Sequence, residues 1–182
     1  MLRRFLRLVP VALALFLLAA NFTVFNVDAH NWNGYHWNRG GNHTEINEYN
    51  TAVYFSDAEA ARVSKWGKIG ILYNYRVGSH TDVSVYDGNF GATGWSGLAS
   101  LENCCDWDWG CWCYDHISHG HARYNSYYNY SAYSRQYVFC QEVFHTYGFD
   151  HDNYGGCMDY NGTVNTLVNH NVNDFYGRYQ NH

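Results

Sequence analysis

The chain has 182 residues, with 11 basic and 16 acidic side chains and a net charge of −5 when histidine is neutral. This acidic balance disfavours a nucleic-acid partner, which needs a basic surface. Aromatic residues make up 19% of the chain and there is a single proline, so Asn, Asp and Gly must form the turns.

The N-terminal stretch MLRRFLRLVPVALALFLLAA joins arginines to an apolar run. The run is shorter than the ~20 apolar residues of a membrane span and is typical of a secretory signal peptide. We expect cleavage after Ala29, with Ala20 as the other candidate and an uncleaved anchor as the alternative. The prediction is a signal peptide over 1–29 and one domain over 30–182, which is secreted, extracellular, monomeric and without membrane attachment.

Six cysteines in a secreted chain predict disulfides. Cys140 and Cys157 flank one motif-bearing segment, and we expect them to pair. The other four crowd into CCDWDWGCWC and are expected to pair among themselves in one of three connectivities, with a zinc knuckle as the alternative. These four are Cys104, Cys105, Cys111 and Cys113.

After an aromatic-rich arm over 30–43, composition and periodicity predict a series of short elements. In chain order they are a strand over 51–55, a helix over 56–69, strands over 69–77, 81–88, 94–101 and 116–125, a helix over 131–147 and a closing helix over 171–179. The glycines of the 94–101 strand favour a place at the sheet edge.

The helix over 131–147 has residues for two different faces. Gly148 ends the helix, because glycine adopts a left-handed backbone without steric cost. Aromatic residues and one cysteine recur at spacings of four and three, which predicts a stripe facing the core. The members of the stripe are Tyr133, Tyr137, Cys140, Phe144 and Tyr147.

The stretch CQEVFHTYGFDH carries the chemistry. Gln141 and His145 are four apart and share a helix face, and Glu142 leans toward the same side. A turn at Gly148 can return His151 to that point. One amide oxygen, two imidazoles and a carboxylate are the groups that zinc-assisted hydrolysis needs.

This stretch resembles the signature H-E-x-x-H-x-x-G-x-x-H and Met-turn of the metzincin clan of zinc peptidases. Glu142, His145, Gly148, His151 and Met158 match it position by position. The resemblance implies an α+β fold with a twisted mixed sheet of about four or five strands, an active-site helix, a Met-turn and a C-terminal helix. It also implies a Zn²⁺ cofactor and a peptide or protein substrate aligned on the 94–101 strand.

The same resemblance assigns roles to residues near the metal. Glu142 would be the general base, and Tyr160 stands where some metzincins carry a tyrosine that binds zinc or steadies the transition state. Gln141 replaces the first histidine, and an amide oxygen is a weaker zinc ligand than imidazole. We expect Gln141 to complete the site directly or through a water molecule; the alternatives are another histidine and a degenerate site.

Two functions follow. The first is a secreted zinc endopeptidase, and the second is a catalytically inactive binding protein of the same fold that recognises a glycan, cell-wall or protein partner. His119 and His121 alternate on one strand and could hold a second metal with His116, or form an ordinary polar strand face. His36 and His170 receive no role from the sequence.

Overall fold

The computed structural model describes residues 32–63, 67–79, 82–103, 115–162 and 164–182. The predicted signal peptide and the cluster of four cysteines lie outside these residues. Among the described residues, no helix is both long and apolar enough to cross a bilayer.

The main sheet has four strands in the order β2 (Glu48–Asn50), β4 (Val83–Gly88), β6 (Ile117–Asn125) and β5 (Gly97–Asn103). The first three are parallel and β5 runs antiparallel to β6, so the sheet is mixed and β5 forms one edge. The α+β class and the mixed sheet with four strands are confirmed. The predicted strands over 81–88 and 116–125 agree with β4 and β6, and the 94–101 strand begins three residues later than expected.

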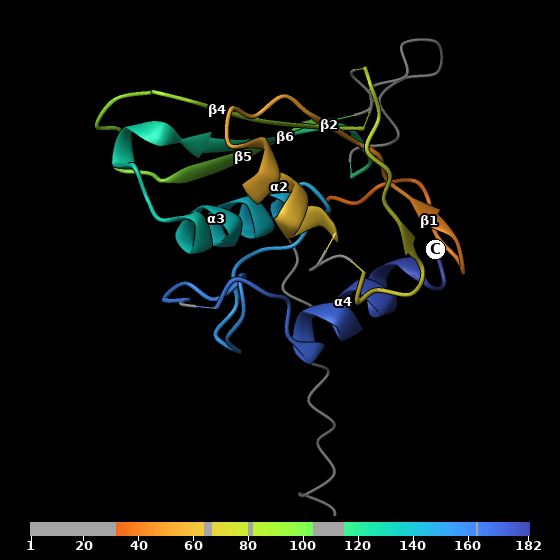
Figure 1. Cartoon of the computed structure of the whole chain (residues 1–182). Helices are drawn as coiled ribbons and strands as arrows, with labels where there is room; N and C mark the ends of the chain where they lie inside the picture. Colours follow the sequence, from red (N-terminus) through yellow and green to blue (C-terminus); the bar gives the residue numbers. More distant parts are fainter. Residues whose placement is uncertain (1–31, 64–66, 80–81, 104–114, 163) are drawn as a thin grey trace, which may run out of the picture.

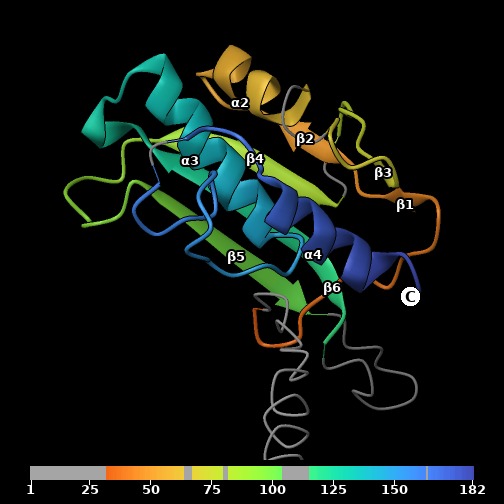
Figure 2. The same ribbon diagram turned by 90° about the horizontal axis from the view of Figure 1, so that it is seen from below.

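Three helices lie on the same side of this sheet (Figure 1): α2 (Phe55–Ala61), α3 (Ala132–His145) and α4 (Asn169–Tyr179). Helix α3 crosses β5 and β6, and α4 follows beside its C-terminal end (Figure 2). Val138, Phe139 and Val143 of α3 are buried against the inner face of the sheet. Both predicted C-terminal helices are therefore present, and α3 carries the motif.

The predicted stripe on α3 is confirmed over its second half. Cys140, Phe144 and Tyr147 are fully buried, whereas Tyr133 is 51% exposed and Tyr137 is half-buried. Residues 131–133 at the start of α3 are exposed, so a residue there can match the helical period without being part of the core. Ser131 caps the helix by accepting a hydrogen bond from the Ser134 N–H.

The strand predicted over 51–55 is wrong, because these residues form a turn and the start of α2. The Asp87 carboxylate on β4 accepts hydrogen bonds from the Val53 and Tyr54 N–H groups, at 3.0 and 2.8 Å. This tertiary contact fixes the start of the helix, whose N-cap residue Tyr54 makes no side-chain capping hydrogen bond. Helix α2 also ends at Ala61, eight residues before the predicted end.

The strand predicted over 69–77 is mostly irregular, with only β3 (Leu72–Tyr73) in regular pairing. It pairs in parallel with β1 (Thr44–Glu45), a segment that the sequence analysis assigned to no element. Backbone hydrogen bonds continue along the pair to Val77, whose N–H donates to the Glu48 carbonyl. The segment is extended as predicted, but Asn74 breaks its ladder by donating its side-chain amide to the Ile46 carbonyl.

Candidate active site

A cavity of about 420 Å³ opens between α3, the edge strand β5 and the loop that follows α3. Four residues of the predicted motif line it together: Gln141, Glu142, His145 and His151. Segment 94–99, Trp32 and Asp150 complete the wall. The helix period and the glycine turn thus bring the motif to one place, as the sequence predicts.

His145, the last residue of α3, is held in one tautomer. Its Nδ1 lies 2.7 Å from the Phe149 carbonyl oxygen, which can only accept, so Nδ1 carries the hydrogen and Nε2 has the lone pair. Burial lowers the pKa of His145 to about 4, so the imidazole is neutral at physiological pH. A neutral imidazole oriented by a backbone carbonyl is the usual state of a metal ligand.

His151 meets His145 after the turn at Gly148. The two ring centroids are 4.5 Å apart at an interplanar angle of 70°. Burial lowers the pKa of His151, and the neighbouring Asp150 carboxylate opposes this shift. Its Nδ1 lies 3.6 Å from Asp150 Oδ1, within the range of an ion pair but too far for a hydrogen bond.

The orientation of the Gln141 amide follows from its neighbour Tyr137, one helical turn earlier. The Tyr137 hydroxyl donates its single hydrogen to the Asp159 carbonyl oxygen at 2.8 Å. It must therefore accept from Gln141, whose Nε2 donates to it at 3.1 Å. Oε1 is the amide atom left for a ligand, so Gln141 presents an oxygen and not a nitrogen donor.

Glu142 is 6% exposed and is enclosed by β5. A Cβ atom at Gly97 would overlap its carboxylate and the Val138 side chain, so a larger residue at this strand position would have to displace them. Burial raises the pKa of Glu142 to about 8; a hydrogen bond from the Ala99 backbone and the charge of Arg123 oppose the rise. The carboxyl group is thus poised to hold or release a proton near neutral pH.

Gly148 serves a second purpose beyond ending the helix. It has φ +87°, and a Cβ atom there would overlap the Tyr35 carbonyl oxygen. The N-terminal arm passes this point closely enough for the Trp32 N–H to donate to the Gly148 carbonyl at 3.0 Å. The Trp32 ring then lies 5.4 Å from the His145 ring and forms part of the cavity wall.

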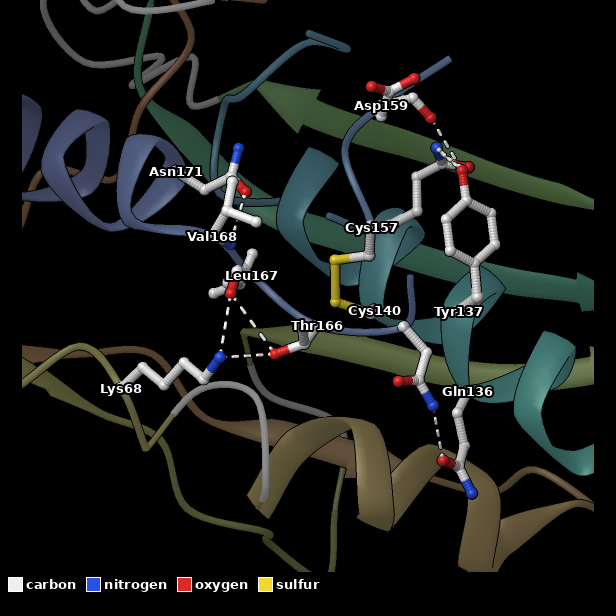
Figure 3. Close-up of a disulfide and its surroundings, with 12 residues drawn as sticks. Lys68, Gln136, Tyr137, Cys140, Cys157, Asp159, Thr166, Leu167, Val168 and Asn171 are labelled. Carbon is white, nitrogen blue, oxygen red and sulfur yellow. Dashed lines mark hydrogen bonds between the residues drawn. A yellow bond between two sulfur atoms is a disulfide. The ribbon is translucent and has the colours of Figure 1, made fainter. Parts of the chain in front are cut away.

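The predicted disulfide between Cys140 and Cys157 is present (Figure 3). It joins α3 to the loop that carries Met158, whose side chain is fully buried. The Asp152 N–H donates to the Met158 carbonyl at 2.8 Å, and the Asn171 side chain of α4 donates to the Asp152 carboxylate. The loop over 152–159 is therefore attached to both α3 and α4.

Tyr160 follows this loop and contacts His151. Its ring stacks on His151, with centroids 4.4 Å apart and an interplanar angle of 22°. The side chain is 64% exposed, so its hydroxyl remains accessible to a substrate.

The other histidines considered in the sequence do not join the cavity. His119 Nε2 bonds the Ser84 hydroxyl at 3.2 Å, and His121 Nε2 bonds Glu102 at 3.1 Å. They are neighbours on β6, but His116 is not with them: it lies beside His36 and His182. The parts played by Trp32 and Gly97 were not predicted from the sequence, although a glycine inside a strand is a known signal of close approach.

This arrangement offers one amide oxygen, two neutral imidazoles and a buried carboxyl group around an open cavity. No model of a known protein family matches the sequence, and no curated protein is significantly similar to it. The resemblance to metzincins therefore rests on the motif between residues 140 and 160.

Proposed function

We propose that the protein is a secreted, zinc-dependent endopeptidase with a metzincin-like fold and Met-turn. The observation that carries the proposal is the joint lining of one cavity by Gln141, Glu142, His145 and His151 beside an edge strand. His145, His151 and Gln141 Oε1 would hold the metal, because both imidazoles are neutral and the amide presents its oxygen. Bound zinc would polarise the scissile carbonyl and make water more acidic.

The chain's own residues supply the remaining steps. Glu142 takes a proton from water at its carboxylate and passes it to the leaving amine. The exposed Tyr160 hydroxyl donates a hydrogen bond to the developing oxyanion. Strand β5 aligns an extended peptide by strand addition, since it is paired with β6 on one side and lies at the end of the strand order.

A second cavity supports an extended substrate. It has a volume of about 340 Å³ and is lined by Trp32, Tyr35 and residues 99–101 of β5. Trp32 and Ala99 border both cavities, so the two follow the same strand on either side of the tryptophan. A groove of this kind fits several residues of a peptide and favours an endopeptidase over an enzyme that removes terminal residues.

The decisive experiment is cleavage of an unbiased peptide library by the folded, disulfide-intact protein with Zn²⁺. Glu142→Gln, which keeps the shape of the side chain, and a chelator serve as controls. We expect cuts that disappear in both controls. Cleavage that persists at the parent rate in Glu142→Gln would contradict the proposal, and no cleavage by any folded form would favour the binding-protein alternative.

A further inference from the structure

Three histidines from distant parts of the chain converge outside the proposed active site. They are His36 in the N-terminal arm, His116 just before β6 and His182 after α4. One ligand nitrogen from each lies within 4.8 Å of the other two. None of the three lines the cavity beside α3. Among the described residues, these three are the metal-ligating side chains whose ligand atoms converge in this way.

His36 is held in the tautomer that a metal ligand needs. Its Nδ1 lies 2.8 Å from the Gly34 carbonyl oxygen, which can only accept a hydrogen bond. Nδ1 therefore carries the hydrogen, and the lone pair is on Nε2. A backbone carbonyl that orients the ring from behind is the usual neighbour of a metal-bound histidine.

The backbone places His36 beside His116. The His36 N–H donates to the Asp115 carbonyl and the Ile117 N–H donates to the His36 carbonyl, both at 2.8 Å. These two bonds bracket His116 in a parallel bridge, and the two rings meet edge to face with centroids 4.9 Å apart.

His182 is brought to this pair by close packing between the arm and the end of α4. A Cβ atom at Gly40 would lie 2.5 Å from His182 Cβ and 2.6 Å from the Tyr179 carbonyl oxygen, so only glycine allows this approach. The Gly41 N–H also donates to the Tyr179 carbonyl at 2.7 Å. The His182 ring then lies 4.6 Å from the His36 ring.

The three converging ligand atoms are all imidazole nitrogens. Neutral imidazole is the form that coordinates metals. Three imidazole nitrogens suit Zn²⁺, Cu²⁺ and Ni²⁺, whereas Ca²⁺ and Mg²⁺ prefer oxygen ligands.

We propose that His36, His116 and His182 form a second metal site, which binds Zn²⁺ or another divalent ion of the class that prefers imidazole. The ion ties the N-terminal arm and the end of α4 to the start of β6. The same arm carries Trp32 to the cavity beside α3, so this site has a structural role. The proposal stands on these three residues and does not depend on the peptidase activity.

The test is a zinc titration of the disulfide-intact protein produced without a polyhistidine tag. The parent is compared with His36→Gln, His116→Gln and His182→Gln, and His43→Gln is the matched control because its ring stacks on Tyr73 outside the cluster. We expect each cluster variant to lose one zinc equivalent or to bind it more than about tenfold more weakly. The control should bind as the parent does.

Two further measurements identify the ligands of the bound ion and separate this site from the proposed catalytic site. Cu²⁺ bound to the parent should show nitrogen hyperfine coupling from three imidazoles, which His182→Gln should reduce; this substitution is at an exposed position and leaves the core intact. In a His151→Asn background the cluster should still bind one ion, which separates it from the proposed catalytic zinc. Equal stoichiometry and affinity in the parent and all three cluster variants would overturn the proposal.

Discussion

Gly97 has no side chain, and this leaves space for the Glu142 carboxyl group beside β5. The Glu142 carboxyl group lies where a Cβ atom of residue 97 would be, against the Ala99 backbone of the same strand. The edge strand therefore supplies both the space for the carboxyl group and one hydrogen bond to it.

We predict that Gly97→Ala displaces Glu142 and lowers kcat/KM about 100-fold, because small misplacements of a reacting group have effects of this size. Peptide cleavage and circular dichroism would be measured together. Gly177→Ala on α4 is the control, since a Cβ atom there meets no neighbour, and it should leave activity unchanged. Parent activity in Gly97→Ala would show that the carboxyl group needs no such space.

The hydroxyl hydrogen of Tyr137 decides which amide atom of Gln141 is left to face the cavity. Tyr137→Phe removes the acceptor of Gln141 Nε2 while keeping the ring. We expect zinc affinity at the peptidase site to fall about tenfold, as is usual when a residue that orients a ligand is lost.

Competitive zinc titration with a chromogenic chelator would measure this change. Tyr133→Phe, which removes the hydroxyl of a half-exposed tyrosine on the same helix, is the matched control. An unchanged affinity in Tyr137→Phe would mean that the amide orientation does not depend on this hydroxyl or that Gln141 is not a ligand. Gln141→Ala would distinguish the two, since only the second outcome leaves its affinity at the parent value.

At the scale of elements, the disulfide is the covalent connection between α3 and the loop that carries Met158 and Tyr160. Its loop spans 17 residues, for which chain entropy predicts a contribution of about 3 kcal/mol to the free energy of unfolding. We expect the double variant Cys140→Ala/Cys157→Ala to lose this amount in urea unfolding. Met158→Leu, a change of similar volume beside the bond, should cost less than about 1.5 kcal/mol.

A double variant within about 0.5 kcal/mol of the parent would instead indicate that the loop is held by hydrogen bonds alone. Asp152 is the residue that would then be responsible, because it joins the Met158 backbone to Asn171 of α4. Zinc binding by both variants, measured together with stability, would show how far the metal site depends on the disulfide.

The segment 44–50 explains why two short strands escaped sequence analysis. Its residues alternate between buried and less buried positions, as in any strand with one face inward. The inward residues, however, are mostly polar: Thr44, Glu48 and Asn50 accompany Ile46. Every second residue of the segment is buried, but most of these buried residues are polar. The sequence therefore lacks the alternation of hydrophobic and polar residues that predicts a strand.

For the whole molecule, Glu48 is the buried carboxyl group with the clearest effect on pH dependence away from the proposed zinc site. It is 2% exposed, and burial raises its pKa from 4.5 to about 7, opposed by Arg62 and by hydrogen bonds from Asn74 and Tyr147. The folded state thus holds a proton that the unfolded chain releases above pH 4.5. The stability present below that pH is lost as the pH rises to about 7.

We predict that Glu48→Gln removes this loss. Relative to the parent, its free energy of unfolding should rise by about 3 kcal/mol between pH 4.5 and 7 and stay level above pH 7. Urea unfolding at several pH values would measure it. Glu45→Gln, with a side chain that is 46% exposed, is the control and should show no such trend. A constant difference between Glu48→Gln and the parent would contradict the prediction.

Much of the molecule could be read from local pattern. Strands β4 and β6, the two C-terminal helices and the Cys140–Cys157 pair follow from periodicity, turn residues and cysteine positions, and the α+β class follows from the resemblance to metzincins. The motif between Gln141 and His151 could be located because helix geometry and a glycine turn act over a few residues. These features depend on residues that are close together in the chain, so they can be predicted from the sequence.

Other features depend on contacts between distant segments. The start of α2 depends on Asp87 of β4, and β1 pairs with β3, which lies almost 30 residues later in the chain. The choice of Gln141 oxygen over nitrogen depends on the Asp159 carbonyl, and the histidine cluster joins positions 36, 116 and 182. Hydrogen bonds and close packing act through space, so residues far apart in sequence carry no periodic sign that they will meet.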